Sequence, residues 1–151
     1  MGKISAGILL YKKKLDQLQV LLVHPGGPFF KNKDAGWWTI PKGESENDEE
    51  LLKTALREFQ EETGYVPSGN FRPLNPIIQK GGKTVYGWAI AGELEVANIV
   101  CNTFDLEWPP KSGKIQQFPE IDQARWFDLA EARLKINERQ IAFLDELMTW
   151  A

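Results

Sequence analysis

Residues 43–65 read GESENDEELLKTALREFQEETGY, and charge gathers here as nowhere else in the chain. Between Glu44 and Glu62, eight acids stand against one lysine and one arginine, a net charge of −6, whereas the whole chain carries −3. Neighbouring like charges destabilise a helix by about 0.2–0.5 kcal/mol per pair. Either a bound cation or a solvated acidic helix face explains the cluster, and charge alone favours the solvated face.

The apolar residues of this stretch recur at helical spacing. They form one face made of Leu51, Leu52, Ala55, Leu56 and Phe59. We predict a helix over residues 47–63, with Ser45 or Asn47 as the N-cap and Gly64 just beyond the C-terminus.

Three glutamates border this apolar face. At about 100° per residue, Glu62 lies roughly 40° from Glu58 in one direction, and Glu61 lies roughly 60° from it in the other. A helix packed on its apolar face would hold these carboxylates at the rim of the core, where an uncompensated charge is costly. A hard divalent cation with oxygen ligands compensates such charges well, so we expect Mg²⁺, or Mn²⁺ in its place.

The spacing of the polar residues resembles the Nudix box, G-x5-E-x7-R-E-U-x-E-E-x-G-U, where U is aliphatic. Every glycine and polar position of the pattern is filled between Gly43 and Gly64. The departures are Phe59 and Tyr65, which are aromatic where an aliphatic residue is usual. The likeness extends to the flanking segments, so residues 1–151 are expected to form one Nudix domain.

The resemblance implies an α/β fold, an α/β/α sandwich around a mixed β-sheet, and hydrolysis of a diphosphate linkage. It implies that Glu58, Glu62 and Glu61 bind the metal together with the backbone carbonyl of Lys42. In the same pattern, Arg57 would orient the helix carboxylates and Glu49 would fix the contact between loop and helix.

The general base for the attacking water stays open at this stage. A carboxylate must take the proton, and Glu58 and Glu61 are candidates within the box. Residues 118–127, FPEIDQARWF, are similar to a segment in which a glutamate approaches the metal site of the family. Glu120 is therefore a third candidate, against the alternative of an ordinary loop acid.

Residues 38–43, WTIPKG, are similar to the start of the box in diadenosine tetraphosphate hydrolases of the animal and archaeal type. We expect cleavage of that nucleotide to ATP and AMP, with Lys42, Lys83, Trp38 and Tyr86 as substrate contacts. The alternatives are a nucleoside-triphosphate pyrophosphohydrolase, an RNA 5′-pyrophosphohydrolase and a non-catalytic nucleotide-binding or sensor domain.

The remaining sequence predicts a mixed α/β order. We expect strands at 4–11, 19–24, 37–40, 71–79, 84–94 and 124–127, a hairpin turn at 80–83, a long loop at 102–118 and a helix at 137–150.

Composition excludes several classes of protein. One cysteine and one histidine supply neither an internal disulfide nor a Cys/His zinc cluster. No apolar run is long enough for a membrane span, and we expect a cytoplasmic protein without a leader segment. With a pI near 5.3 there is no broad basic face, so the expected partner is a small nucleotide and not a stably bound nucleic acid. The oligomeric state stays open.

Overall fold

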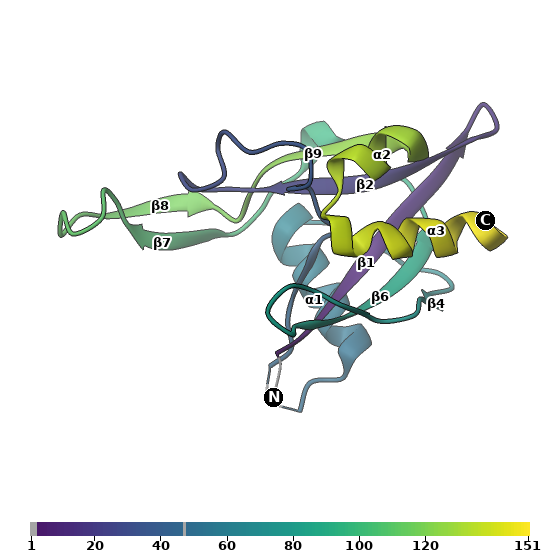
Figure 1. Cartoon of the computed structure of the whole chain (residues 1–151), viewed down its shortest axis with the longest axis horizontal. Coiled ribbons are helices and arrows are strands. Elements are labelled where there is room, and N and C mark those ends of the chain that lie inside the picture. Colours follow the sequence, from purple (N-terminus) through teal and green to yellow (C-terminus); the bar gives the residue numbers. More distant parts are fainter. Residues whose placement is uncertain (1–2, 47) are drawn as a thin grey trace.

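The computed structural model describes residues 3–46 and 48–151, which form a three-layer domain (Figure 1). Within these residues, a seven-stranded sheet runs in the order β4-β6-β1-β2-β9, with β3 beside β1 and β5 beside β6. A separate two-stranded sheet consists of β7 and β8. The strands are β1 (Ile4–Lys14), β2 (Gln17–Pro25), β3 (Lys42–Glu44), β4 (Arg72–Pro73), β5 (Ile77–Ile78), β6 (Thr84–Ala91), β7 (Thr103–Glu107), β8 (Ile115–Pro119) and β9 (Ile121–Asp128).

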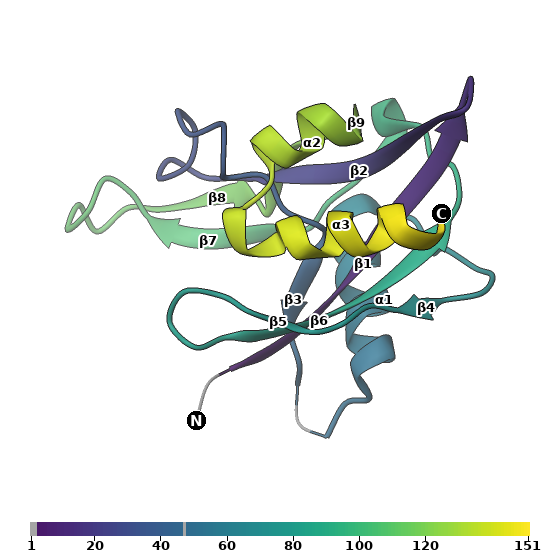
Figure 2. The ribbon, with the colours of Figure 1, turned by 45° about the vertical axis from the view of Figure 1, so that its right-hand side comes forward.

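Helices cover both faces of the large sheet (Figure 2). Helix α1 (Leu51–Thr63) packs on one face through Ala55 and Phe59, against the even-numbered residues Ala6, Ile8 and Leu10 of β1. Helices α2 (Leu129–Lys135) and α3 (Ile141–Trp150) cover the other face, where the core includes Leu9, Phe127, Phe143 and Leu144. This arrangement confirms the predicted α/β/α sandwich around a mixed sheet.

Along one of its edges, strand β1 pairs with two different strands, one near each end. Residues 11–14 pair with β2, whereas residues 5–7 pair with β3, both antiparallel. On its other side, β1 pairs in parallel with β6 from Ile4 to Tyr11. The sheet therefore opens between β3 and the end of β2, and α1 lies beneath this opening.

The start of helix α1 differs from the prediction. The helix begins at Leu51 with Glu50 in the N-cap position, not Ser45, and Asn47 lies outside the described residues. Asp48 has a φ of 53°, a left-handed conformation that cannot belong to an α-helix. The predicted C-terminal boundary is confirmed, because Gly64 has a φ of 76° just after Thr63.

Residues 102–118 were predicted as a loop, and this prediction was wrong. They include the hairpin of β7 and β8, which projects from the body of the domain as an arm (Figure 1). Phe104 and Phe118 are paired across the arm, but Gln116 stands opposite Leu106, so the period-two pattern is incomplete on β8. Because this alternation is incomplete, the sequence pattern did not predict strand β8.

Three smaller differences concern short elements. Residues 37–40 make only isolated bridges, Val23 with Thr39 and Trp38 with Ile136. Residues 71–79 hold two short strands instead of one, while the turn at 80–83 is confirmed by the hydrogen bond from Gln79 N–H to Lys83 C=O. Helix α2 was missed, although Asp128 caps it by accepting from Glu131 N–H.

The predicted helix at 137–150 begins as a 3₁₀ turn, η2 (Glu138–Gln140), and continues as α3. Gln140 at this junction is fully buried. Its amide oxygen accepts from Ile40 N–H, and its amide nitrogen donates to Thr39 Oγ1 and Gln79 Oε1. One side chain thus joins the start of the C-terminal helix to the segment before β3 and to the segment after β5.

Among the described residues, no helix combines the length and the apolar character that a bilayer-spanning segment needs.

Candidate active site

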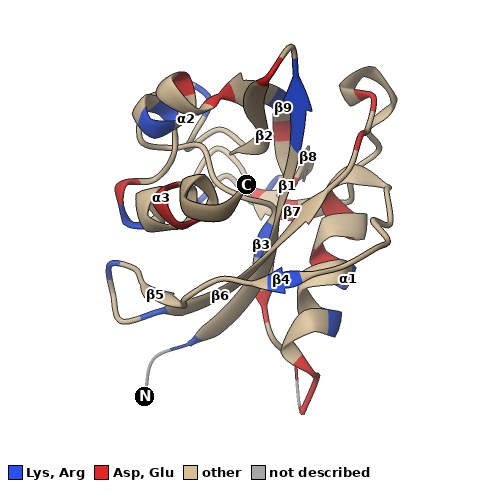
Figure 3. Ribbon diagram, turned by 90° about the vertical axis from the view of Figure 1, so that its right-hand side faces the viewer, with Lys and Arg blue, Asp and Glu red and all other residues tan. Residues whose placement is uncertain are grey.

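Three carboxylates from two elements meet at the opening in the sheet. One oxygen each of Glu58, Glu61 and Glu120 lies within 4.8 Å of the other two. Glu58 and Glu61 are on α1, and Glu120 lies between β8 and β9, at the base of the arm. The acidic side of α1 is visible in Figure 3. The two acids of the helix and the more distant Glu120 are therefore brought together as a single cluster.

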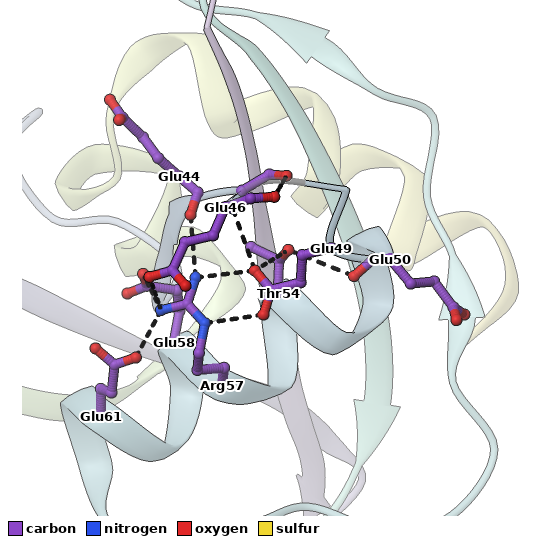
Figure 4. A network of polar contacts seen from close by, with 9 residues as sticks. Glu44, Glu46, Glu49, Glu50, Thr54, Arg57, Glu58 and Glu61 are labelled. Carbon is purple, nitrogen blue, oxygen red and sulfur yellow. Dashed lines mark hydrogen bonds and ion pairs between the residues drawn. The ribbon is translucent and has the colours of Figure 1, made fainter.

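Arg57 holds the acidic residues of the box in place (Figure 4). Its Nε and Nη2 each donate to Glu49 at 3.0 Å, and its Nη1 donates to Glu61 at 2.7 Å and to Glu58 at 3.1 Å. Its Nη2 also donates to the carbonyl of Glu44 in β3. The guanidinium therefore ties the strand and the start of the helix to the acids of the cluster.

Glu49 accepts two of the hydrogen bonds from Arg57, and Arg57 with its carboxylate partners is called the clamp below. Hydrogen bonds from Arg57, and then one from Thr54 Oγ1, lower the pKa of Glu49 to about 2. Glu49 also raises the pKa of the Arg57 guanidinium. Both side chains thus stay charged over the whole range in which proteins are usually studied.

Gly43 allows Glu58 to approach the strand. A Cβ atom at this position would lie 2.0 Å from Glu58 Cδ, far inside van der Waals contact. Only glycine leaves room for the carboxylate against β3, which explains why a glycine opens the box.

Glu62 is the most buried acid of the site, with 7% of its surface exposed. Among the described residues, its Oε2 has no hydrogen-bond partner. Burial, then repulsion from Glu58 and Glu120, raises its pKa well above the ordinary value, and the Lys42 charge opposes this shift.

Two acids of the cluster, Glu58 and Glu120, have pKa values shifted in the same direction. Burial and then Glu61 raise the pKa of Glu58, and the same two causes raise the pKa of Glu120. Crowded carboxylates with raised pKa values and one buried, unpartnered oxygen are the donor set that a hard divalent cation takes. The residues present therefore fit a site for such a cation.

Lys42 lies on the other face of the sheet, directly over Gly7. A Cβ on Gly7 would come within 2.6 Å of Lys42 Cβ, so the glycine makes room for the lysine stem. Burial lowers the pKa of the Lys42 ammonium, and the nearby Lys83 lowers it further. Lys83 and Lys42 share this face with Glu44, to which Lys83 is paired at 3.7 Å.

The backbone carbonyl of Lys42 points away from β1. The flanking carbonyl of Pro41 accepts from Ile8 N–H, and Ser45 N–H donates to Ile4. Antiparallel ladders alternate their hydrogen bonds, so the carbonyl between these two turns to the opposite side. The carbonyl of Glu44 turns to that same side and accepts from Arg57. Lys42 C=O is thus directed away from β1, on the side of the opening.

The structure places two expected substrate contacts apart from the two lysines. Trp38 is only 2% exposed and packs edge-on against Phe127, so its ring belongs to the core, while the exposed neighbour is Trp37. Tyr86 pairs with Ala6 and therefore faces α1, whereas Lys42 and Lys83 lie on the opposite face. The structure does not bring Tyr86 together with the two lysines.

Sequence reasoning missed the contributions of Gly7 and Gln140. The glycine acts through space that it leaves empty, and the glutamine acts through contacts with residues up to 101 positions away. A single sequence carries no local signal for either kind of contribution.

The fold and the cluster define a class of α/β/α domains with an acidic centre on a helix packed against the sheet. The NUDIX domain family matches residues 1–147, and the chain belongs to this family.

Two curated relatives show how the family members differ. Rat bis(5′-nucleosyl)-tetraphosphatase (asymmetrical) is 47% identical over 101 residues, which cover 63% of this chain and 58% of the relative. The mRNA-decapping protein g5R of African swine fever virus is 29% identical over 119 residues, covering 74% of this chain and 44% of the viral protein. The chain thus spans about half the length of these relatives.

Solved structures support the fold. The Caenorhabditis elegans Ap4A hydrolase in a binary complex aligns with a TM-score of 0.64 and 20% identity, over 98% of this chain and 96% of that one. The NUDIX domain of Shewanella oneidensis NrtR, complexed with ADP ribose, aligns with a TM-score of 0.65 and 19% identity, over 99% and 89% of the chains.

Proposed function

We propose that this chain hydrolyses a phosphoanhydride bond of a nucleoside polyphosphate with the help of a divalent cation, and that diadenosine tetraphosphate is its substrate. The observation that carries the proposal is the convergence of Glu58, Glu61 and Glu120 within 4.8 Å beside the buried Glu62. The products would be ATP and AMP.

Each residue of the site has a part in this reaction. Glu58, Glu61, Glu62 and the carbonyl of Lys42 would hold Mg²⁺ or Mn²⁺, which polarises phosphoryl oxygens and acidifies a bound water when present. Arg57 keeps the helix carboxylates aimed at the opening through its bond to Glu49. These groups set the geometry before the substrate arrives.

Glu120 is the proposed general base. It comes from outside α1, and burial with the repulsion of Glu61 raises its pKa above the ordinary value, which makes the carboxylate a stronger base. Water attacks phosphorus, its proton passes to the carboxylate, the new P–O bond forms and the anhydride P–O bond breaks. The leaving phosphate carries away the electron pair of the broken bond.

The substrate assignment is supported by two lysines and one relative. Lys42 and Lys83 place two cations near each other on the sheet face opposite α1, and the charge of Lys42 also interacts with Glu62 and Glu58. Of these two lysines, only Lys83 has a carboxylate within 4 Å among the described residues. A chain of several phosphates supplies the anionic length that two such cations require. The rat relative is a tetraphosphatase, and it shares the largest fraction of identical residues with this chain among the relatives described above.

A second candidate is hydrolysis at the 5′ end of an RNA. The viral mRNA-decapping protein covers 74% of this chain, more than the rat relative does. Such an activity needs only the phosphate chain at the centre, since the rest of the RNA would extend away from it.

The test is a product analysis by anion exchange with Mg²⁺. Diadenosine tetraphosphate would be compared with nucleoside triphosphates, with a 5′-triphosphorylated RNA and with a capped RNA. ATP plus AMP from the dinucleotide, with slow breakdown of the others, supports the proposal. Pyrophosphate released from a triphosphate would favour a nucleoside-triphosphate pyrophosphohydrolase, and pyrophosphate released from RNA would favour an RNA 5′-pyrophosphohydrolase. The absence of turnover with both Mg²⁺ and Mn²⁺ would favour a domain that binds nucleotides without catalysis.

A set of variants tests the site itself. Glu58→Gln and Glu62→Gln should each remove turnover while the protein stays folded. Glu50→Gln is the matched control, because Glu50 precedes the same helix but its side chain points away from the cluster (Figure 4). Full turnover in both site variants would show that the cluster is not the centre.

A further inference from the structure

Glu120 is held in the site by its backbone. Unlike the acids of α1, it belongs to a short connection between two strands, so its position depends on what the connection is fastened to. Its N–H donates to Asn102 C=O at 2.9 Å, and its C=O accepts from Gly26 N–H at 3.0 Å. Asn102 N–H in turn donates to Glu61 C=O at 2.7 Å. The series Glu61, Asn102, Glu120, Gly26 is one continuous hydrogen-bonded path.

Gly26 is the end of that path, and it has no room for a side chain. A Cβ on Gly26 would lie 2.0 Å from the carbonyl oxygen of Pro119, the residue just before Glu120. The obstacle is backbone, so a methyl group could be accommodated only by moving the connection that carries Glu120. The pairing of β2 with β9 also shifts register here, between His24 and Pro25.

The loop after Gly26 is fastened to the arm. Gly27 leaves space for the ring of Phe104, whose Cζ would be 3.0 Å from an added Cβ. Phe29 packs edge-on against Trp108 at 5.2 Å, between the loop and the tip of the arm. Loop residues 26–29 and the arm therefore hold each other, and Glu120 lies where the arm joins the sheet.

We propose that Gly26 is a positioning residue for Glu120: the close approach of its backbone to Pro119 and its hydrogen bond to Glu120 fix the carboxylate against Glu58 and Glu61. The inference rests on the proposed function, in which Glu120 acts at the metal centre. The arm and the loop at 26–29 then serve the chemistry by holding this one side chain in place.

The experiment is a double-mutant cycle on the full chain with Gly26→Ala, Glu120→Gln and the combined variant. The readouts are kcat, KM and the affinity for Mn²⁺ alone, measured by electron paramagnetic resonance. We expect Gly26→Ala to lower kcat by about 10²-fold with little change in KM, as misplacement by about 1 Å does elsewhere. Mn²⁺ binding should weaken in the same variant. In the Glu120→Gln background, Gly26→Ala should change kcat and the Mn²⁺ affinity by less than about twofold each.

Asn32→Ala is the control, since Asn32 is exposed on the same loop and its replacement does not need a left-handed backbone. If Gly26→Ala does not fold, Phe29→Ala takes its place in the double-mutant cycle with Glu120→Gln, because it removes only an exposed ring from the loop. Equal losses in both backgrounds, or unchanged kcat and Mn²⁺ affinity, would overturn the inference. The Mn²⁺ readout separates the two proposals, because it reports on Glu120 even if no nucleotide is hydrolysed.

Discussion

Replacing Arg57 by methionine tests how far the acidic box depends on its single clamp. Arg57 makes four hydrogen bonds to three carboxylates and one to the carbonyl of Glu44, with 27% of its side chain exposed. Methionine keeps the length of the apolar stem but leaves Glu49, Glu58 and Glu61 crowded without a counter-charge. The loss should therefore appear in the stability of the metal-free protein.

The magnitude follows from the burial of the clamp. A hydrogen bond to a charged group contributes about 1.5–3 kcal/mol, and breaking a fully buried ion pair costs about 3–5 kcal/mol. Bonds that share one guanidinium are not additive, and partial exposure screens them. We expect a loss of about 2–4 kcal/mol, which for a domain of this size lowers Tm by roughly 4–16 °C.

The assay is urea unfolding in EDTA, with Arg57→Lys and Arg139→Met alongside. An ammonium cannot reproduce the paired donors to Glu49, so Arg57→Lys should recover less than half of the loss. Arg139 is exposed, and its replacement should change stability by less than about 0.5 kcal/mol. If Arg57→Met also stayed within about 0.5 kcal/mol of the wild type, the clamp would not be holding the box together.

Two further outcomes are expected from the site. Gly43→Ala would push the Glu58 carboxylate away from β3, so turnover should fall at least about 10²-fold, while circular dichroism still shows the fold; normal turnover would mean that Glu58 can act from another position. The raised pKa values of Glu58, Glu62 and Glu120 mean that the folded, metal-free protein binds protons more tightly than the unfolded chain, so it loses stability as pH rises above their ordinary value of 4.5. A cation competes with those protons, and the rise in Tm caused by Mn²⁺ should be larger at pH 7 than at pH 5; an equal rise at both values would contradict the burial of these acids.

The box was predictable because its chemistry is local. The helical period placed Glu58, Glu61 and Glu62 at the rim of the core, and Glu62 is indeed 7% exposed. Residues three and four apart on a helix have fixed directions, so spacing alone determines which side chains meet. The start of the helix was predicted too early, because Asp48 adopts a left-handed conformation that the sequence pattern does not reveal.

The surroundings of the box were less predictable, for reasons that differ from residue to residue. Trp38 and Trp37 alternate, but which one faces the core depends on the bridge from Trp38 to Ile136, nearly one hundred residues later. The direction of Tyr86 depends on the register between β1 and β6, which turns this side chain toward α1. The partners of Glu120 are backbone groups, and a sequence does not show where backbone groups find their hydrogen bonds.

The amide of Gln140 has a consequence for how the protein is made. Chains leave the ribosome from the N-terminus, and a domain generally folds as a unit. The acidic helix is synthesised early, whereas Thr39 and Ile40 form hydrogen bonds with Gln140, which follows 101 positions after Thr39. The acidic helix is thus complete in the nascent chain long before Thr39 and Ile40 can form these hydrogen bonds, which only the finished domain contains.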